Sequence, residues 1–436
     1  MNSNPLYLCV EKTKNMNILI KQATIVDTTS SFNGKIMDIL IEKGNITQLK
    51  KNIASEKNYK TIEADGLCVS VGWLDMQVNF CDPGNEHKDT LENGLKAAAK
   101  GGFTGVCVMS GTNPPLHNKA QIEYVKNRAK DSLVNVFPIG TISYNQEGKD
   151  LSEMYDMQMA GALAFSDYKK PIKDAGLILR ALQYSANINS FIITHCDDKT
   201  ISHDGQMNEG ITSTKLGLKG IPALAEELMI QRNLQILEYT GGKIHFPTIS
   251  TKGSVELIKK AKANGLSVTA GVAAHNLLLD ETELERFDTN YKVNPPLRSK
   301  EDVTAVRKAL ENGIIDVVVS DHNPQDIESK DLEFDLANNG IIALQTAFNC
   351  MVTGVAKITR DKIAESLAEN PRHILGLANE TIKENVKANL TLFTLNDKTT
   401  FTEKDNASKS SNSPFIGKTL NGKVLGVINN GKLVLN

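Results

Sequence analysis

The stretch Gly72-Trp73-Leu74-Asp75-Met76-Gln77-Val78-Asn79 opens the part of the chain that decides the fold. It begins the first of eight short apolar runs, which cover residues 73–80, 104–109, 134–142, 162–165, 190–196, 243–249, 267–273 and 316–320. The segments between them, such as 172–186, 214–231 (with Pro222 inside), 254–263 and 300–312, repeat apolar residues at helical spacing. This alternation predicts an α/β protein with a closed (β/α)8 TIM barrel rather than an open sheet.

The two ends of the chain have a different pattern. Residues 17–25, 36–50, 389–395 and 422–435 alternate like short strands, with turns at Lys43-Gly44-Asn45 and Asn429-Asn430-Gly431. We therefore expect a small β-sandwich domain built from both termini, residues 1–71 and 384–436, around a barrel at 72–383. Residues 403–414, rich in Ser, Asn and Lys, are predicted to form a mobile surface loop.

Composition excludes several classes of protein. The 436 residues are 40% hydrophobic and carry a formal net charge of -2, so no basic field for nucleic acid or a membrane surface is expected. The six cysteines form no CxxC pair, and the first 16 residues lack the apolar run of a signal peptide. We expect a cytoplasmic protein that associates with neither nucleic acid nor membrane.

The polar residues at the strand ends are the candidates for chemistry, because the mouth of such a barrel lies at the carboxyl ends of its strands. Strand four ends in Asp167, strand five in His195 and strand eight in Asp321. Together these three side chains could hold a divalent metal ion and its water. Taken singly, such a histidine is also a common hydrogen-bonded core residue, and such an aspartate also caps a following helix.

Several ordered motifs resemble those of the bacterial type I dihydroorotases of the amidohydrolase superfamily. They are Asp75-x-Gln77-x-Asn79, Asp82-Pro83-Gly84-Asn85-Glu86-His87-Lys88-Asp89-Thr90, Ala164-Phe165-Ser166-Asp167, Thr194-His195-Cys196-Asp197-Asp198, Ser250-Thr251-Lys252-Gly253-Ser254, Lys292-Val293-Asn294-Pro295-Pro296-Leu297-Arg298 and Ser320-Asp321-His322-Asn323-Pro324. The resemblance implies a barrel with one or two metal ions that closes N-carbamoyl-aspartate to dihydroorotate in pyrimidine synthesis. Asp167 favours this family over hydantoinases and allantoinases, which usually carry a carboxylated lysine there.

The chain departs from this family at the site itself. Residues that the family uses for metal or substrate binding are replaced at six positions, which are Gln77 and Asn79 (histidines in the family), Cys81 (arginine), Gly111 (asparagine), Thr248 (histidine) and Gln325 (histidine). No neighbouring histidine is expected to compensate. His245 lies an odd number of residues before Thr248, so in a strand it faces the helical shell, and His87 and His275 match other positions.

Counting the ligands that remain gives two incomplete sites. The resemblance leaves Asp321 and Asp167 for one metal, and His195 and Asp167 for the other. Neutral amide oxygens replace imidazoles poorly in a zinc site, so no zinc is expected at full occupancy. Loss of the arginine at Cys81 removes a bidentate grip on a carboxylate. Asn294 is a candidate substrate-binding residue, although Asn294-Pro295-Pro296 could equally only shape its loop.

Two hypotheses follow. In the first, the chain is a non-catalytic dihydroorotase homologue, a homo-oligomer that serves as a partner of aspartate transcarbamoylase, as some family members without the histidines do. In the second, it is an active dihydroorotase or related cyclic-amide hydrolase. One zinc ion would then be bound by Asp167, His195 and Asp321, and Asp321 would be the general base for ring opening.

Overall fold

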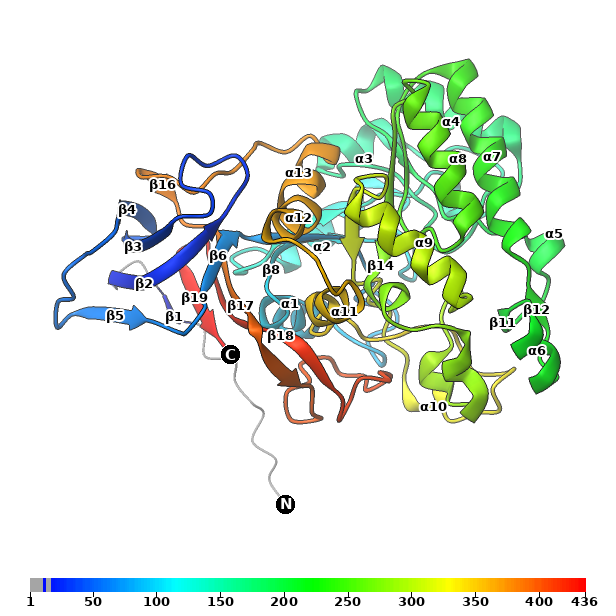
Figure 1. The fold of residues 1–436 in the computed structure, drawn as a ribbon. Coiled ribbons are helices and arrows are strands. Elements are labelled where there is room, and N and C mark those ends of the chain that lie inside the picture. Colours follow the sequence, from blue (N-terminus) through cyan, green and yellow to red (C-terminus); the bar gives the residue numbers. More distant parts are fainter. Residues whose placement is uncertain (1–10, 13–16) are drawn as a thin grey trace.

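The computed structural model describes residues 11–12 and 17–436. It contains a barrel surrounded by helices and, beside it, a sheet formed by both ends of the chain (Figure 1). Cys9 and most of the first 16 residues lie outside the described part of the chain. Within the described part, no helix combines the length and apolar character needed to cross a lipid bilayer.

The barrel consists of two parallel sheets that are joined by single bridges. One sheet has the order β7 (Trp73–Val78), β8 (Phe103–Val108), β9 (Asn135–Pro138), and the other β10 (Ile192–Ile193), β13 (Ile244–Phe246), β14 (Val268–Ala273), β15 (Val317–Val319). Parallel bridges Gly140↔Phe165 and Phe165↔Ile192 connect β9 to β10, and Val78↔His322 connects the first strand to the last. The predicted TIM barrel is confirmed, with its fourth strand reduced to the bridge at Phe165.

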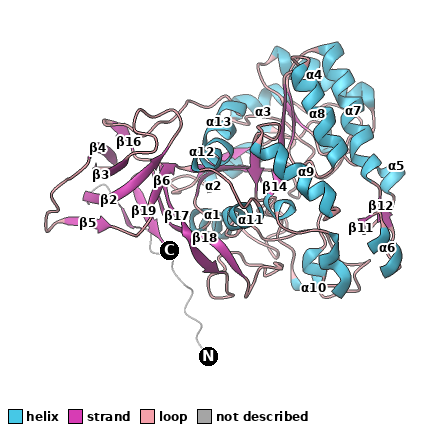
Figure 2. Ribbon diagram, in the orientation of Figure 1, coloured by secondary structure: helices cyan, strands magenta, loops and turns pink. Residues whose placement is uncertain are grey.

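Helices cover the outside of the barrel (Figure 2). The α-helices are α1 (Leu91–Lys100), α2 (Lys119–Arg128), α3 (Met154–Ala160), α4 (Ala175–Asn187), α5 (Lys199–Ser202), α6 (Ile211–Leu216), α7 (Ala223–Thr240), α8 (Lys252–Ala263), α9 (Lys300–Glu311), α10 (Ile327–Lys330), α11 (Ala347–Gly354), α12 (Arg360–Ala364) and α13 (Asn370–Ile374), with a π-helical turn at Glu365–Glu369. Side chains of Thr90, Asn118, Asp174, Thr251 and Ser299 cap the N-termini of α1, α2, α4, α8 and α9.

The helical segment predicted at 214–231 is interrupted. Helix α6 ends at Leu216, the next residue Gly217 has a left-handed φ of 68°, and α7 begins after Pro222. Between them β12 (Gly220–Ile221) pairs with β11 (Met207–Asn208). Proline lacks an amide proton and cannot continue a helix, so it stands at the start of α7.

The terminal sheet has ten strands in the order β1-β19-β18-β17-β6-β2-β3-β4-β16, with β5 beside β2. The N-terminal strands are β1 (Glu11–Lys12), β2 (Asn17–Val26), β3 (Ile36–Glu42), β4 (Asn45–Lys50), β5 (Tyr59–Ile62) and β6 (Cys68–Val71), and the C-terminal ones β16 (Val386–Lys387), β17 (Leu390–Thr400), β18 (Thr419–Asn429) and β19 (Lys432–Leu435). Pairing of β6 with β17 joins the two ends.

The segment predicted as a mobile surface loop is only partly at the surface. Residues 403–405 are exposed, but Ser410, Asn412 and Ser413 are buried. Asn412 accepts a hydrogen bond from the Gln325 amide at 3.0 Å and donates one to the carbonyl of Asn323 at 3.2 Å. The polar composition that suggested a mobile loop instead supplies hydrogen bonds to the chain that follows β15.

Candidate functional site

Asp321 follows β15 at the mouth of the barrel and meets the end of β7. Its Oδ1 accepts a hydrogen bond from Gln77 Nε2 at 2.6 Å. The buried carboxylate of Asp75 holds this junction, because it accepts the backbone amides of Gln77 and Ser320, each at 2.9 Å. An amide therefore donates to the aspartate at the position where the resemblance implies a metal-binding histidine.

The second oxygen of Asp321 is paired with a lysine. Lys169 Nζ lies 2.8 Å from Asp321 Oδ2 and donates a second bond to the backbone carbonyl of Asn294 at 2.5 Å. The side chains of Lys169 and Asp321 are 17% and 5% exposed, so this ion pair is largely shielded from water. Lys169 belongs to the loop after the fourth barrel strand.

Asp167 points to a different set of partners. Its Oδ1 accepts the amides of Ile142 at 2.8 Å and Ser143 at 3.0 Å, and its Oδ2 accepts the Ser143 hydroxyl. Burial raises the pKa of Asp167, although these hydrogen bonds stabilise the charged carboxylate and reduce the shift. Its two oxygens thus fix the loop after β9.

Two buried histidines in the mouth have unpaired ring nitrogens. His195 Nε2 and both ring nitrogens of His275 have no hydrogen-bond partner among the described residues. Burial lowers the pKa of His195 to about 3 and that of His275 to about 4, and the positive charge of Lys169 adds to both shifts. The hydroxyl of Thr248 is likewise buried and unpaired within the described chain. Both imidazoles are therefore neutral at physiological pH.

The other positions at which the family motifs differ also contact residues around the mouth. Asn79 Nδ2 donates to Asn323 Oδ1 at 3.2 Å, and its Oδ1 accepts the Cys81 amide at 3.0 Å. Burial raises the pKa of the Cys81 thiol, so no thiolate is available there. Gln325 accepts Lys88 Nζ at 2.7 Å. Gly111 lies under the ring of Tyr168.

These donors do not fit a zinc ion. In residues 11–12 and 17–436, no three side chains of histidine, cysteine, aspartate or glutamate gather into a group that could hold a metal. The set Asp167, His195 and Asp321 is therefore not brought together as a metal site. Asp321 faces an amide nitrogen and an ammonium group, and zinc requires imidazole, thiolate or carboxylate ligands.

The candidate substrate residue Asn294 and Arg298 of the same motif both have partners within the protein. The Asn294 carbonyl is the second acceptor of Lys169. Arg298 is buried, and its guanidinium donates to Ser250 Oγ at 3.0 Å, Asn208 Oδ1 at 3.0 Å and the Ile221 carbonyl at 2.9 Å. Arg298 therefore joins three loops and has little capacity left to bind a carboxylate.

The two other histidines considered from the sequence lie away from Asp321. His245 Nδ1 forms a hydrogen bond with Thr269 Oγ1 of the neighbouring strand at 2.8 Å. Burial lowers the pKa of His245, and the positive charge of Lys262 in α8 lowers it further. This agrees with the strand parity that directed His245 to the helical shell. His87 is exposed in the loop before α1.

Comparison with known proteins assigns the chain to a family. A family model described as Dihydro-orotase-like matches residues 67–254. The dihydroorotase of Acetivibrio thermocellus is 42% identical over 422 residues, covering 96% of this chain and 99% of the relative. That of Geobacter metallireducens is 40% identical over 424 residues, covering 96% and 99%. The chain belongs to the dihydroorotase-like family.

Solved structures show the same fold at lower identity. The L-hydantoinase (dihydropyrimidinase) from Arthrobacter aurescens has a TM-score of 0.84 at 24% identity, with 97% of this chain and 96% of that chain covered. The dihydropyrimidinase from Brevibacillus agri has a TM-score of 0.80 at 20% identity, with 97% and 95% covered. At these identities the likeness concerns the fold alone.

Sequence reasoning missed Tyr168 and Lys169, two residues that fill the mouth of this dihydroorotase-like chain. It also missed that His275 lies close enough to Asp321 and Lys169 to feel their charges. A signal for the first two was present, since both directly follow Asp167 at the end of a predicted strand. Neither is a usual metal ligand. His275 required the fold, because its charge environment includes Asp321 and Lys169 from other strands.

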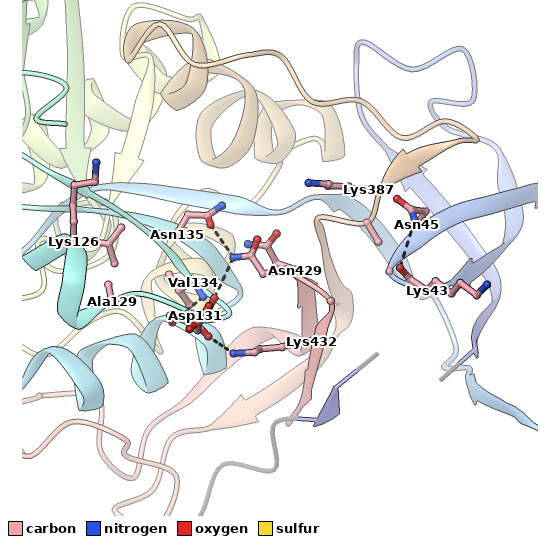
Figure 3. Close-up of a pocket in the computed structure, with 16 residues that line it drawn as sticks. Lys43, Asn45, Lys126, Ala129, Asp131, Val134, Asn135, Lys387, Asn429 and Lys432 are labelled. Atoms are coloured by element: carbon pink, nitrogen blue, oxygen red, sulfur yellow. Dashed lines mark hydrogen bonds between the residues drawn. The ribbon is translucent and has the colours of Figure 1, made fainter. Parts of the chain in front are cut away.

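A groove of about 810 Å³ lies outside the mouth, between the terminal sheet and the barrel (Figure 3). Lys43 and Asn45 are on one side of it, and Asp131, Asn135 and Lys432 on the other (Figure 3). Two of its lysines already donate hydrogen bonds within the protein: Lys432 to the carbonyl of Asp131, and Lys126 to the carbonyl of Ala160. The groove contains none of the residues singled out from the sequence as candidates for chemistry.

Proposed function

We propose that this chain is a non-catalytic dihydroorotase-like protein of pyrimidine biosynthesis. The observation that carries the proposal is the state of Asp321, whose two oxygens are occupied by the Gln77 amide and the Lys169 ammonium. A general base must be free to accept a proton from the reacting group. Here the carboxylate is ion-paired inside the protein, and the donors around it do not suit a metal-bound water.

The metal content and activity of the purified protein test the proposal. Protein purified without chelator should contain well under one equivalent of zinc, and EDTA should leave its unfolding midpoint unchanged. Dihydroorotate turnover should be at background, and Asp321→Asn should not lower it further. The Acetivibrio thermocellus dihydroorotase, carried through the same purification and assay, is the matched control.

Two results would contradict the proposal. One is stoichiometric zinc by elemental analysis. The other is measurable turnover that falls by about 10²- to 10⁴-fold in Asp321→Asn, the loss expected when a general base is removed.

A second candidate is an active dihydroorotase or related cyclic-amide hydrolase with a reduced metal site. It is favoured by the relatives named dihydroorotase, which match at about 40% identity over nearly the full length. This function requires Lys169 to leave Asp321 when zinc or substrate binds. The zinc and Asp321→Asn measurements separate it from the first candidate.

We further propose that the chain is an oligomeric partner of aspartate transcarbamoylase. Support comes from the retention of the complete barrel and terminal sheet around a mouth without catalytic donors, since function on such a fold can reside in its surfaces. A stable interface would bury upwards of about 1,200 Å² in total. The partner itself comes from the resemblance to non-catalytic family members.

Co-expression followed by size-exclusion chromatography tests this association. The two chains should elute together at micromolar concentration and remain together in moderate salt. Separate elution, with a transcarbamoylase that is fully assembled and active alone, would rule out the scaffold role.

A further inference from the structure

We infer that Tyr168 and Lys169 form a built-in plug in the barrel mouth, in which the Lys169 ammonium takes the place of a metal ion beside Asp321 and the Tyr168 ring fills the space over Gly111. We call these two residues the plug. The inference rests on the non-catalytic part of the proposed function and is independent of the partner. It explains how the mouth stays folded without the cation that the family places there.

Lys169 meets the requirements for a fixed internal cation. Its ammonium group has three donors, and two are used on Asp321 Oδ2 and the Asn294 carbonyl. These acceptors belong to the loops after strands eight and seven, so the lysine joins two loops of the mouth through its ammonium group. It also lies 5.8 Å from the centre of the Tyr168 ring, within the range of a cation–π contact.

The charge balance of the mouth depends on this lysine. Asp321 is 5% exposed, and a buried carboxylate without a counter-charge is costly. Gln77 donates a neutral hydrogen bond. Lys169 is thus the cationic group in direct contact with Asp321.

Tyr168 explains a second departure from the family. Its backbone is left-handed, with φ of 53°, and its amide donates to Ser166 Oγ at 3.0 Å. A Cβ atom added at Gly111 would lie 2.5 and 2.9 Å from two carbons of the Tyr168 ring. A side chain at position 111 and the ring at position 168 therefore exclude each other. The ring stands where the resemblance implies a substrate-binding asparagine.

The ion-pair half of the plug is tested by a double-mutant cycle on thermal stability. Lys169→Met should lower Tm by about 3 °C or more, because it leaves a buried carboxylate unpaired. Lys170→Met, in the exposed neighbour, is the control and should change Tm little. The double variant Lys169→Met/Asp321→Asn should lose clearly less than the sum of its two single variants. Additive losses would overturn the inference.

The cation-replacement half is tested with zinc alone as the probe. The variant Gln77→His/Asn79→His offers two imidazoles and Asp321, which is a workable ligand count, but Lys169 still occupies the carboxylate. Adding Lys169→Ala should raise zinc affinity by about ten-fold or more, because it removes the positive charge at the site. Equal zinc uptake by the two variants, including no uptake by either, would contradict the plug. Circular dichroism checks that both are folded.

The ring half is tested at Gly111. Gly111→Ala should lower Tm in the natural chain and should lower it much less in a Tyr168→Ala background, where the ring is gone. Equal losses in both backgrounds would show that the ring does not define this space. Stoichiometric zinc in the unmodified protein would defeat the proposed function itself. Low zinc together with additive Lys169 and Asp321 effects would defeat only the plug.

Discussion

Individual side chains at the mouth show how the same residue types serve different purposes. Asp321 and Asp167 are both buried aspartates at strand ends. Asp321 accepts hydrogen bonds from a side-chain amide and an ammonium group, whereas Asp167 accepts them from backbone amides of the loop after β9. Asp75 is more deeply enclosed, and burial raises its pKa to about 7. The partners of each carboxylate, rather than its place in a motif, decide its chemistry.

Buried neutral histidines should make the protein sensitive to acid, and His245 allows a clean test. Burial lowers the pKa of His245 to about 3, from about 6.5 in an unfolded chain. Below pH 6.5 the unfolded chain takes up a proton that the folded chain does not, so stability falls as pH falls toward 3. His245→Asn should remove up to about 2 kcal/mol of the stability lost between pH 7 and pH 5.

Urea unfolding at the two pH values measures this difference, with His87→Asn, at an exposed position, as the control. Other groups, such as Asp75, titrate equally in the variant and the natural chain and cancel in the comparison. A pH response of His245→Asn equal to that of the natural chain would mean that this imidazole is accessible to protons.

Among the elements, β7 joins the barrel to the terminal sheet. Trp73 at its start is fully buried and packs on Phe103 of β8, Phe348 of α11 and Phe393 of β17, with ring centroids 6.1, 4.8 and 5.3 Å away. Its indole Nε1 donates to Ser70 Oγ at 2.9 Å. One side chain thus connects strands from both ends of the chain and a helix of the barrel.

Trp73→Ala should therefore lower the free energy of unfolding by about 3 to 5 kcal/mol, the usual cost of truncating a large buried aromatic residue. Tyr239→Ala, at the end of α7, provides a control, because Tyr239 is 80% exposed and its loss should cost less than about 0.5 kcal/mol. Circular dichroism in urea is the suitable measurement, since Trp73 is the chain's one tryptophan. A small loss would indicate that barrel and sheet unfold separately.

At the level of the whole molecule, the inner mouth and the outer surface can be varied independently. His195 and Asp167 are buried at the mouth, whereas the proposed partner would bind the outside of the barrel or the terminal sheet. Substitutions at these two residues should therefore leave co-elution with aspartate transcarbamoylase intact. Charged residues introduced into an apolar surface patch should break it. Loss of association on changing His195 would instead place the interface at the mouth.

The sequence by itself determined the barrel, and it supplied the prediction that ordinary zinc ligands are replaced. The first followed from the alternation of apolar runs with helical segments, since periodicity is a local property that burial imposes on each element. The second followed from residue identity alone, because Gln77, Asn79 and Thr248 cannot supply an imidazole. The limits of single elements were less well predicted, as the interrupted segment at 214–231 and the partly buried segment at 403–414 show.

Only the tertiary structure decided which groups surround Asp321 in the mouth. Lys169 reaches Asp321 across 152 positions of sequence, and Gln77 reaches it across 244. The direction of Asp167 toward Ser143 depends on the loop after β9. The ring of Tyr168 reaches the space at Gly111 from another strand. Such contacts are set by the closure of the barrel, which brings the carboxyl ends of all its strands to one mouth, and no local pattern encodes them.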